Sequence, residues 1–542
     1  MKTMAKRVCI IGAGLSGLTT IKCCLDEGLE PTCFEMGDDI GGLWKYQENV
    51  EEGRGNVFYS LITNSSKEFT AYSDFPTPEN FPNFLGHTHM FQYLQAYAKE
   101  FKLNERIHLK TKVEAVTKTA DFQSSGQWNV TTVDENGIKN DMVFDAVMVC
   151  SGHNYNPNMP MDSFPGIENF KGKIIHSKDY KKPSAYAGKN VLVIGFGNSG
   201  GDIATEVSEH ASQVFLSTRR GAWVLGRISD RGYPYDLLLL TRWKNLLRHY
   251  IPWDMFLKFE ERNANFRFDH KIFGANPTFR IFSQQMVVND NLPLCVMKGK
   301  LSMKPNVASF TDTAAVFVDG SRAESLDVVV FATGFCFQFP FLEVDDTFTV
   351  RDNCNCLYKN VFLPKIQPPT IAFINLVEAN VSATSVCEMQ SRWVTRIFKG
   401  LISLPDEAEM LKEISQEQEK NSHKFPNLKR HTIEIEDCPA YTDDLASQIG
   451  VRPRLLPLFL KDPGLALKIF FGPLTNYQYR LQGPGRWEGA AQAIRTQNHR
   501  VMVPFRGGSV TCSNTQGFGL VNLIVSLVLL AGCCLVVWFQ TS

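Results

Sequence analysis

The chain has 542 residues, enough for two or more domains that each bury a core. Apolar residues make up 44% and charged residues 21%, which is ordinary for a globular protein. The 56 lysines and arginines balance the 56 aspartates and glutamates, so the charge gives no reason to expect a nucleic-acid partner. The composition favours a neutral enzyme that handles small molecules.

The first predicted elements form a βαβ unit with a glycine-rich turn. The apolar run 7–11 is the first strand, and Gly12-x-Gly14-x-x-Gly17 leads from it into a helix. Gly12 allows the tight turn, Gly14 lets the backbone approach a pyrophosphate, and Gly17 lets helix and strand pack closely. The next strand ends at Glu35, whose carboxylate can accept hydrogen bonds from ribose hydroxyls and would repel a 2′-phosphate. This cradle is therefore predicted to hold FAD or NAD.

A second unit repeats the design further along the chain. Gly195-x-Gly197-x-x-Gly200 again separates an apolar strand from a helix, and Asn198 and Ser199 lie inside the motif at the predicted start of that helix. Backbone N–H groups at a helix start favour a phosphate group. The repeat predicts a second dinucleotide site.

The strand that follows the second motif ends in cations instead of an acid. Its sequence QVFLS runs into Thr218, Arg219 and Arg220. An arginine at this position can pair with a 2′-phosphate, so the second site is predicted to bind NADPH. The alternative is that one arginine merely ends a strand at the surface. Two sites of opposite charge preference indicate that hydride passes from NADPH to a flavin.

Strands are predicted at 127–133, around 145–152 and around 314–335, and a charged helix at 404–424. Residues 221–295 lose the α/β rhythm and are rich in tryptophan and leucine, which predicts a helical insertion. The 14 cysteines include no C-x-x-C pair, so we expect reduced thiols, a cytosol-facing protein and no bound metal.

The C-terminal segment from Gly517 to Phe539 carries no charged residue, and Asn522 and Ser526 are its only clearly polar members. Its length suits a helix that crosses a bilayer, and Trp538 suits the membrane interface. The alternative is a buried core helix. We expect a membrane anchor that contacts lipid, and the sequence leaves open whether it crosses the bilayer or lies in one leaflet.

A third motif makes a family resemblance specific. Phe170-x-Gly172-x-x-x-His176-x-x-x-Tyr180 precedes the second glycine motif and matches the signature F-x-G-x-x-x-H-x-x-x-[FY]. The stretches DDIGGLWKY, TNSSKE, DFPTPENFPNF, FDAVMVCSGH and FATGF also resemble the flavin-containing monooxygenases, with the animal microsomal, dimethylaniline monooxygenase-like members closest. The resemblance covers nearly the whole chain, including the hydrophobic tail.

The resemblance implies a chemistry. Such enzymes bind FAD in the first site, reduce it with NADPH, and add dioxygen to carbon 4a of the flavin as a hydroperoxide. A soft nucleophile, usually sulfur or an amine nitrogen of a small xenobiotic-like molecule, then takes the distal oxygen, and some members instead insert oxygen beside a ketone. The resemblance also implies the endoplasmic reticulum membrane, with the catalytic part facing the cytosol. A homo-oligomer is compatible with it.

The same resemblance implies roles for particular residues. Asn64 is similar to the family's asparagine beside the flavin and the nicotinamide, where an amide can both donate and accept. Gly42, Leu43 and Trp44 are expected to let the backbone approach FAD, with Trp44 near the ring system. Gly334 resembles the glycine that closes over the cofactor as the chain returns to the FAD domain.

His176 has two interpretations, a general base or a residue that holds the linker before the second nucleotide domain, and we favour the second. The chain also departs from the family pattern: Glu378 stands for a usual glutamine, Val381 for a glycine and Ser385 for a proline, and Phe335 replaces a common tyrosine. Altered FAD binding, intermediate lifetime or substrate choice is expected from these changes.

Two other functions compete with monooxygenation. An NADPH oxidase that releases hydrogen peroxide differs only in how fast the oxygenated flavin decays. A poorly active dinucleotide-binding membrane protein is the third alternative. A flavin disulfide reductase is disfavoured because it needs a redox dithiol.

The predicted fold class is α/β, with two Rossmann-like dinucleotide-binding domains (FAD and NADPH), a helical insertion and a C-terminal hydrophobic membrane anchor. The predicted boundaries are 1–154 for the first part of the FAD domain, 155–330 for the NADPH domain with its insertion at about 221–295, 331–445 for the return to the FAD domain, 446–511 for a C-terminal packing region and 512–542 for the anchor.

Overall fold

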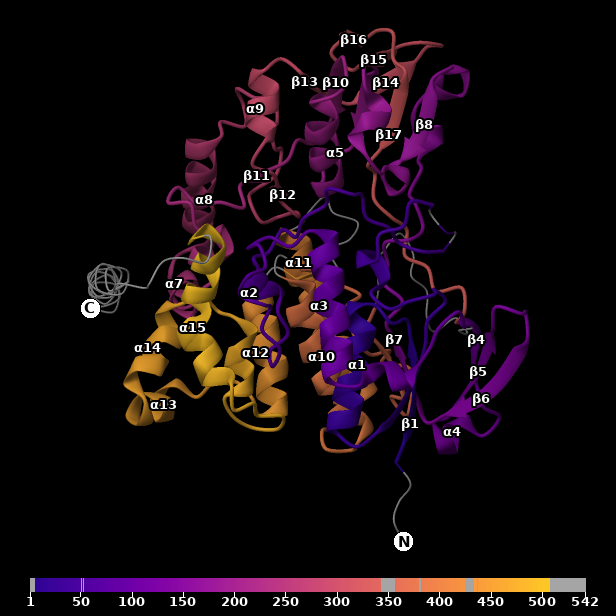
Figure 1. Cartoon of the computed structure of the whole chain (residues 1–542), viewed down its shortest axis with the longest axis vertical. Helices are drawn as coiled ribbons and strands as arrows, with labels where there is room; N and C mark the ends of the chain where they lie inside the picture. Colours follow the sequence, from indigo (N-terminus) through magenta and orange to yellow (C-terminus); the bar gives the residue numbers. More distant parts are fainter. Residues whose placement is uncertain are drawn as a thin grey trace.

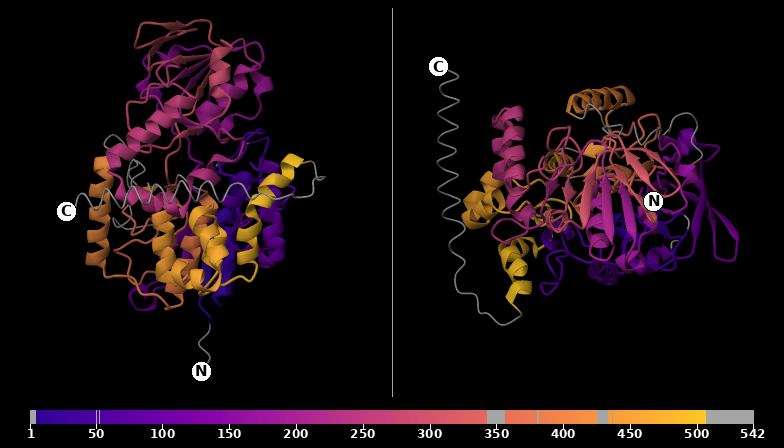
Figure 2. Two further views of the ribbon diagram at one scale, coloured as in Figure 1. Left: turned by 90° about the vertical axis from the view of Figure 1, so that its left-hand side faces the viewer. Right: turned by 90° about the horizontal axis from the view of Figure 1, so that it is seen from above.

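The computed structural model describes residues 5–49, 51, 53–342, 356–379, 382–424, 433–435 and 437–506. Two lobes lie one above the other in Figure 1, each built around a parallel sheet. The helices at the C-terminal end of the described chain pack beside the lower lobe, as the turned views in Figure 2 also show. The arrangement is an α/β fold in which one chain crosses from the lower lobe to the upper lobe and back.

The lower lobe contains a five-stranded parallel sheet. Its strand order is β18 (Ile371–Phe373), β7 (Ala146–Val149), β1 (Arg7–Ile11), β2 (Glu30–Phe34) and β3 (Ile107–His108). Ile11 pairs with Phe34, so the turn after β1 and the residue after β2 emerge side by side at the carboxyl edge. Buried apolar side chains on β1 and β7 explain why the sequence shows unbroken hydrophobic runs there.

Helices cover this sheet. α1 (Leu15–Asp26) packs against α10 (Ala383–Phe398), a helix far along the chain whose side chains are buried over nearly its whole length. α3 (His87–Glu100) adds tyrosines to the same core. The short helices α2 (Lys67–Thr70) and α4 (Phe122–Ser125) complete the lobe, together with the antiparallel strands β4 (Lys112–Lys118), β5 (Trp128–Val133) and β6 (Lys139–Phe144).

The upper lobe contains a second five-stranded parallel sheet. Its order is β13 (Leu301–Lys304), β10 (Gln213–Ser217), β9 (Asn190–Ile194), β17 (Val328–Phe331) and β8 (Lys173–His176). Ser217 pairs with Ile194, which again places a glycine turn beside the end of the following strand. α5 (Asn198–Ser208) and α9 (Leu292–Met297) pack on this sheet, and β14 (Val307–Phe310), β15 (Ala315–Phe317) and β16 (Arg322–Ala323) form an antiparallel appendage.

The region expected to interrupt the α/β rhythm is a helical insertion between β10 and β13. It contains β11 (Val224–Leu225), α6 (Tyr235–Leu239), α7 (Arg242–Tyr250), α8 (Trp253–Arg267) and β12 (Val287–Val288). A small core of its own gathers Trp223, Leu257, Ala264 and Ile281. In Figure 1, α7 and α8 run down the left flank and connect the two lobes.

The charged helix predicted at 404–424 is α11 (Glu407–Lys424). The remaining helices are α12 (Cys438–Ile449), α13 (Leu455–Lys461), α14 (Pro463–Phe471) and α15 (Ala490–Met502), and β19 (Glu378–Ala379) pairs with β20 (Glu434–Ile435). No helix within the described ranges is long and apolar enough to cross a membrane. The predicted anchor, from Gly517 to Phe539, lies outside the described residues.

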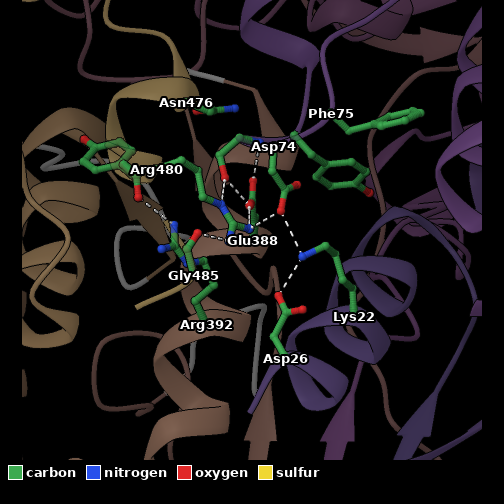
Figure 3. A network of polar contacts seen from close by, with 12 residues as sticks. Lys22, Asp26, Asp74, Phe75, Glu388, Arg392, Asn476, Arg480 and Gly485 are labelled. Carbon is green, nitrogen blue, oxygen red and sulfur yellow. Dashed lines mark hydrogen bonds and ion pairs between the residues drawn. The ribbon is translucent and has the colours of Figure 1, made fainter. Parts of the chain in front are cut away.

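A buried ionic network joins the C-terminal helices to the lower lobe (Figure 3). Arg480 donates to Glu388 at 2.7 Å and pairs with Asp74 at 2.8 Å, and Lys22 of α1 pairs with the same Asp74 oxygen at 2.9 Å. Glu388 also accepts from the backbone N–H of Ser73. Because buried charges need partners, these four segments are held in one arrangement.

Candidate functional site

A cavity of about 560 Å³ opens at the carboxyl edge of the lower sheet, where β1, β2 and β7 end. Among the residues that line it are six of those predicted from the sequence: Gly12, Gly14, Glu35, Gly42, Leu43 and Trp44. Its size lies within the usual range for small-molecule sites. The structure therefore brings the glycine turn, the acid after β2 and the Gly-Leu-Trp segment together.

The glycines are required by the backbone around them. Gly12 has φ of +98°, and a Cβ atom at Gly17 would lie 1.8 Å from the carbonyl oxygen of Gly12. Gly17 does not line the cavity, in keeping with its predicted packing role. A Cβ atom at Gly14 would meet only the backbone of Gly42, with the Cα atom at 3.6 Å and the nitrogen at 4.0 Å. The space above Gly14 is therefore left for a ligand to approach the backbone.

Helix α1 begins directly at this cavity. Its N-cap is Gly14, and no side chain caps its first turn. Uncapped N–H groups and the positive end of the helix dipole both favour a bound diphosphate. This part of the cavity fits the pyrophosphate of a dinucleotide.

Glu35 is buried and its carboxylate is held by the backbone. One oxygen accepts from the N–H of Ala13 and the other from the N–H of Gly37, both at 2.8 Å. Each carboxylate oxygen can accept more than one hydrogen bond. The group is thus fixed in place with lone pairs remaining for ribose hydroxyls, so the residues present fit FAD.

Arg54 is a residue of this cavity that the motifs did not indicate. Its side chain is 6% exposed, pairs with Glu51 at 2.8 Å, and lies so close to Gly37 that a Cβ atom there would be 2.6 Å from the guanidinium. It lies in the segment EEGRG, where no spacing marks it as a ligand-binding residue. Its guanidinium lies at the cavity lining with its charge paired to Glu51.

The second cradle lies at the carboxyl edge of the upper sheet. Gly195 has φ of +110°, and a Cβ atom at Gly200 would lie 1.9 Å from the Gly195 carbonyl oxygen. Nothing lies within 4 Å of a Cβ atom placed at Gly197, the N-cap of α5. Asn198 accepts from the N–H of Val288 through its side-chain oxygen, at 2.8 Å, and Ser199 is exposed. The helix start is open for a second diphosphate.

The residues after β10 lie beside this turn. The Thr218 hydroxyl accepts from the N–H of Gly221 at 3.0 Å, and Arg219 is exposed. No ion pair between Arg219 and an acidic side chain occurs within the part of the chain that the structure describes. Burial and the neighbouring Arg219 charge lower the pKa of Arg220. An exposed cation beside the glycine turn fits a 2′-phosphate.

Asn64 does not line the lower cavity, although its loop belongs to the same lobe. It contacts the insertion instead: Nη2 of Arg227 donates to its side-chain oxygen at 2.7 Å. Two residues further on, the N–H of Ser66 donates to the Asp236 carboxylate at 2.6 Å. Burial raises the pKa of Asp236 to about 6. The sequence analysis assigned no role to Arg227 or Asp236, although Asp236 lies in the stretch YPYDLLLLTR, which also resembles the family.

His176 and Gly334 meet between the lobes. One ring nitrogen of His176 accepts from the N–H of Lys178 at 3.1 Å, and the other lies 3.0 Å from the carbonyl oxygen of Gly334. The second nitrogen must therefore carry the proton and donate it. Burial lowers the pKa of this histidine. Both ring nitrogens form hydrogen bonds with backbone groups, which supports the interpretation that His176 holds the linker over the interpretation that it is a general base.

The comparison with known protein families decides the identity. The model of the flavin-binding monooxygenase-like family matches residues 5–538. The chain belongs to this family. Flavin-containing monooxygenase 5 of Cavia porcellus is 48% identical over 511 residues, which cover 94% of this chain and 95% of the relative. Dimethylaniline monooxygenase (N-oxide-forming) 2 of Mus musculus is 46% identical, covering 97% and 98%. The protein is an FAD-dependent monooxygenase that uses NADPH.

Solved structures share the fold of this flavin-binding monooxygenase. The S-allyl-L-cysteine S-oxygenase of Allium sativum superimposes with a TM-score of 0.65 at 24% identity, over 92% of this chain and 100% of that chain. A cyclohexanone monooxygenase of Rhodococcus superimposes with a TM-score of 0.58 at 16% identity, over 82% and 98%. At these identities the likeness concerns the arrangement of the elements.

The departures from the family pattern occupy different surroundings in this monooxygenase. Glu378 lies in β19, where its register partner is Glu434 of β20. It does not line the lower cavity, whereas Asn375 does. The Ser385 hydroxyl donates to the Asn476 side chain at 2.6 Å, a bond that a proline lacks. Phe335 packs edge-on against His176. Val381 lies outside the described residues.

Proposed function

We propose that this monooxygenase transfers one oxygen atom from dioxygen to a sulfur or an amine nitrogen of small molecules. The observation that carries the proposal is the pair of unlike cradles, one ending in the buried acid Glu35 and the other in the exposed cation Arg219. Bound FAD, reduced by NADPH, supplies the oxygen chemistry. The protein must bind both cofactors, orient them and exclude water.

We assign the lower cavity to FAD. The backbone at Gly12, Gly14 and Gly42 faces the diphosphate, and Gly17 keeps α1 close to the sheet. Glu35 holds the ribose hydroxyls, as its two backbone hydrogen bonds support. The remaining contacts come from Leu43 and Trp44, which line the same cavity. Gly334 does not line this cavity in the structure, and we assign it the role of closing over the cofactor from the returning chain.

We assign the upper cradle to NADPH. The turn residues Gly195, Gly197 and Gly200 let the diphosphate approach the start of α5, where Asn198 and Ser199 form the first turn. A further pair binds the 2′-phosphate, namely Thr218 and Arg219. An exposed arginine with no acidic partner in the described part of the chain supports this role.

Asn64 is the proposed catalytic residue. The side-chain oxygen of Asn64 accepts a hydrogen bond from Arg227, and the amide nitrogen of Asn64 is left to donate a hydrogen bond. A donor fixed in orientation by an arginine suits a position between nicotinamide and flavin. No acid–base pair is needed, because the cofactor carries the bond-making chemistry.

The names of similar proteins support the substrate class. One relative is named for forming an N-oxide of dimethylaniline, and one structural neighbour for oxygenating the sulfur of S-allyl-L-cysteine. Nitrogen and sulfur lone pairs are the common feature of these substrates. We transfer that feature, and not the individual molecules, to this chain.

We also propose that the protein is attached to the endoplasmic reticulum membrane with its catalytic part facing the cytosol. The uncharged segment from Gly517 to Phe539 supports an anchor. Large apolar side chains are exposed on α8 and α13, among them Phe259, Phe266 and Leu460. Deleting residues from 512 onward should release the protein from membranes. If the truncated protein still pellets with them, the exposed apolar side chains hold it.

The function is tested with purified holoenzyme, NADPH and two substrates, a thioether and a tertiary amine. Sulfoxide and N-oxide formed per NADPH should exceed hydrogen peroxide formed per NADPH. Peroxide as the dominant product with both substrates would instead make the protein an NADPH oxidase. Absence of flavin reduction by excess NADPH would make it a binding protein.

A further inference from the structure

The insertion contains a second cavity, of about 420 Å³, between α6, α8 and the ends of β11 and β12. It shares no lining residue with the FAD cavity. Its volume is large enough for a small organic molecule rather than a single ion. The assigned cofactors and the proposed catalytic residue do not account for it.

The lining of this cavity is acidic. Asp230, Glu260 and Asp290 face it together with one cation, Arg267. Arg267 is already paired with Asp230 at 3.2 Å and donates to the carbonyl oxygen of Ile228. The excess of negative charge disfavours an anionic ligand and attracts a cation.

Glu260 is the carboxylate with unused hydrogen-bonding capacity. It lies half-buried on α8, and the described residues offer it no hydrogen bond or ion pair. Burial raises its pKa, and the charge of Lys244 on α7 opposes that shift. The Lys244 ammonium donates to the Leu238 carbonyl at 2.6 Å, and within the described residues it forms no ion pair with Glu260. A half-buried carboxylate of this kind gains most from a cationic partner.

Apolar and aromatic side chains form the rest of the cavity. Tyr235, Phe266, Phe268 and Phe282 line it, and Phe282 has φ of +63°, a backbone conformation that bulky residues rarely adopt. The Phe282 ring stacks on Phe256 of α8 at 6.0 Å. Aromatic faces beside a carboxylate bind alkylated ammonium groups, which are both cationic and apolar.

We propose that this cavity is a second ligand site, which binds a small alkylated ammonium ion with its charge at Glu260 and its alkyl groups against the aromatic side chains. A phosphate or carboxylate ligand is excluded by the acidic lining. A quaternary ammonium ion has no lone pair on nitrogen, so a ligand of this kind is an effector and not a substrate of the proposed oxygenation.

The site is connected to Asn64 through Asp290. This carboxylate lines the cavity, accepts from the backbone N–H of Arg227 at 3.1 Å, and lies 3.8 Å from its guanidinium. Arg227 in turn donates to Asn64. A bound cation attracts the Asp290 carboxylate and so weakens the interaction of Asp290 with Arg227. This change alters the coupling of NADPH use to oxygenation. This consequence rests on the proposed function, whereas binding itself does not.

Binding is tested by calorimetry on the full-length holoenzyme with butyltrimethylammonium, which cannot be N-oxygenated. The uncharged 3,3-dimethylbutan-1-ol serves as the neutral probe. Glu260→Gln should raise the dissociation constant of the cation at least tenfold, and the neutral probe should bind equally to both proteins. Glu100→Gln, which removes an exposed charge on α3, is the matched control and should leave binding unchanged.

Phe266→Ala provides a second variant, because this side chain is 88% exposed and its loss does not disturb the core. It should raise the dissociation constant of the cation severalfold. Equal binding to wild type and Glu260→Gln, or complete competition by a thioether substrate, would overturn the second site. If binding is as expected but the ratio of peroxide to NADPH changes by less than twofold, the connection through Asp290 is overturned while the site stands.

Discussion

Nη2 of Arg227 donates a hydrogen bond of 2.7 Å to the side-chain oxygen of Asn64. The arginine comes from the insertion of the upper lobe and the asparagine from a loop of the lower lobe. The guanidinium also lies 3.7 Å from Asp202 of α5, the helix that begins at the second cradle. One side chain thus ties the proposed NADPH site to the proposed catalytic residue.

Arg227→Lys should uncouple NADPH use from oxygenation. Lysine keeps the charge beside Asp202 and Asp290 but loses the forked geometry that reaches Asn64. A hydrogen bond to a charged group contributes about 1.5–3 kcal/mol, so the catalytic efficiency for product should fall about tenfold or more. Product and peroxide per NADPH are the measurements. Flavin content should not change, and Arg322→Lys, at the exposed position of β16, is the control. Unchanged coupling would show that Arg227 does not position Asn64.

Two matched glycine substitutions should distinguish the proposed FAD site from the proposed NADPH site. A side chain at either glycine would meet little protein. A Cβ atom at Gly14 would have only the Cα atom of Gly42 at 3.6 Å and the backbone nitrogen of Gly42 at 4.0 Å, and a Cβ atom at Gly197 would have nothing within 4 Å. Gly14→Val should therefore fold without flavin. Gly197→Val should stay yellow but resist reduction by NADPH. Absorbance at the flavin band checks both, and a flavin-loaded Gly14→Val protein would refute the first assignment.

Arg219→Ala should affect NADPH far more than NADH. Only NADPH carries the 2′-phosphate, and a charge-assisted contact with phosphate is about twice as strong as a neutral one. We expect the Michaelis constant for NADPH to rise on the order of tenfold and that for NADH to stay within about twofold. Steady-state kinetics with each nucleotide give the ratio. Equal changes would mean that Arg219 does not contact the phosphate.

Both cradles were predictable because their determinants are local. A Cβ atom at Gly17 or Gly200 would clash with the carbonyl of Gly12 or Gly195 in the same turn, and strand ends are visible as the ends of apolar runs. Arg54 and Arg227 were not predictable, because a lone arginine outside a motif resembles any surface cation. The contact of Arg227 with Asn64 spans 163 positions and arises only when distant segments pack together.

The contacts of the residues that depart from the family pattern were also not predictable from the sequence. The serine at position 385, in place of the family's proline, predicts altered flavin surroundings, and this stays a prediction. In the structure its hydroxyl donates a hydrogen bond to Asn476, 91 positions later. The contact between Ser73 and Arg480 spans 407 positions. Sequence patterns report periodicity within an element, and such pairings are set by how elements from opposite ends of the chain dock.

Glu388→Gln should loosen the C-terminal helices. Arg480 is 2% exposed and would keep only Asp74 as a charged partner. Breaking one partner of a buried pair costs about 3–5 kcal/mol, so thermal unfolding should occur several degrees earlier. The double variant Glu388→Met with Arg480→Met should recover part of the loss, because no uncompensated charge remains. The exposed Glu407→Gln is the control. A double variant less stable than the single one would contradict this account.

His270 should make the insertion sensitive to mild acid. It is 2% exposed, its Nε2 atom accepts from the N–H of Val224 at 2.9 Å, and burial lowers its pKa to about 4. Because the folded-state pKa lies below the unfolded value of 6.5, the folded protein binds fewer protons between these values. The contribution of His270 to the free energy of unfolding is therefore highest above pH 6.5, where His270 is neutral in both states. It falls by up to about 3 kcal/mol as the pH falls toward 4. The melting temperature of the wild type should therefore fall between pH 7.5 and 5 by a few degrees more than that of His270→Gln, which does not titrate. His210→Gln, at an exposed position, should follow the wild type. If His270→Gln loses as much as the wild type over this range, the protonation of His270 does not limit the stability of the insertion.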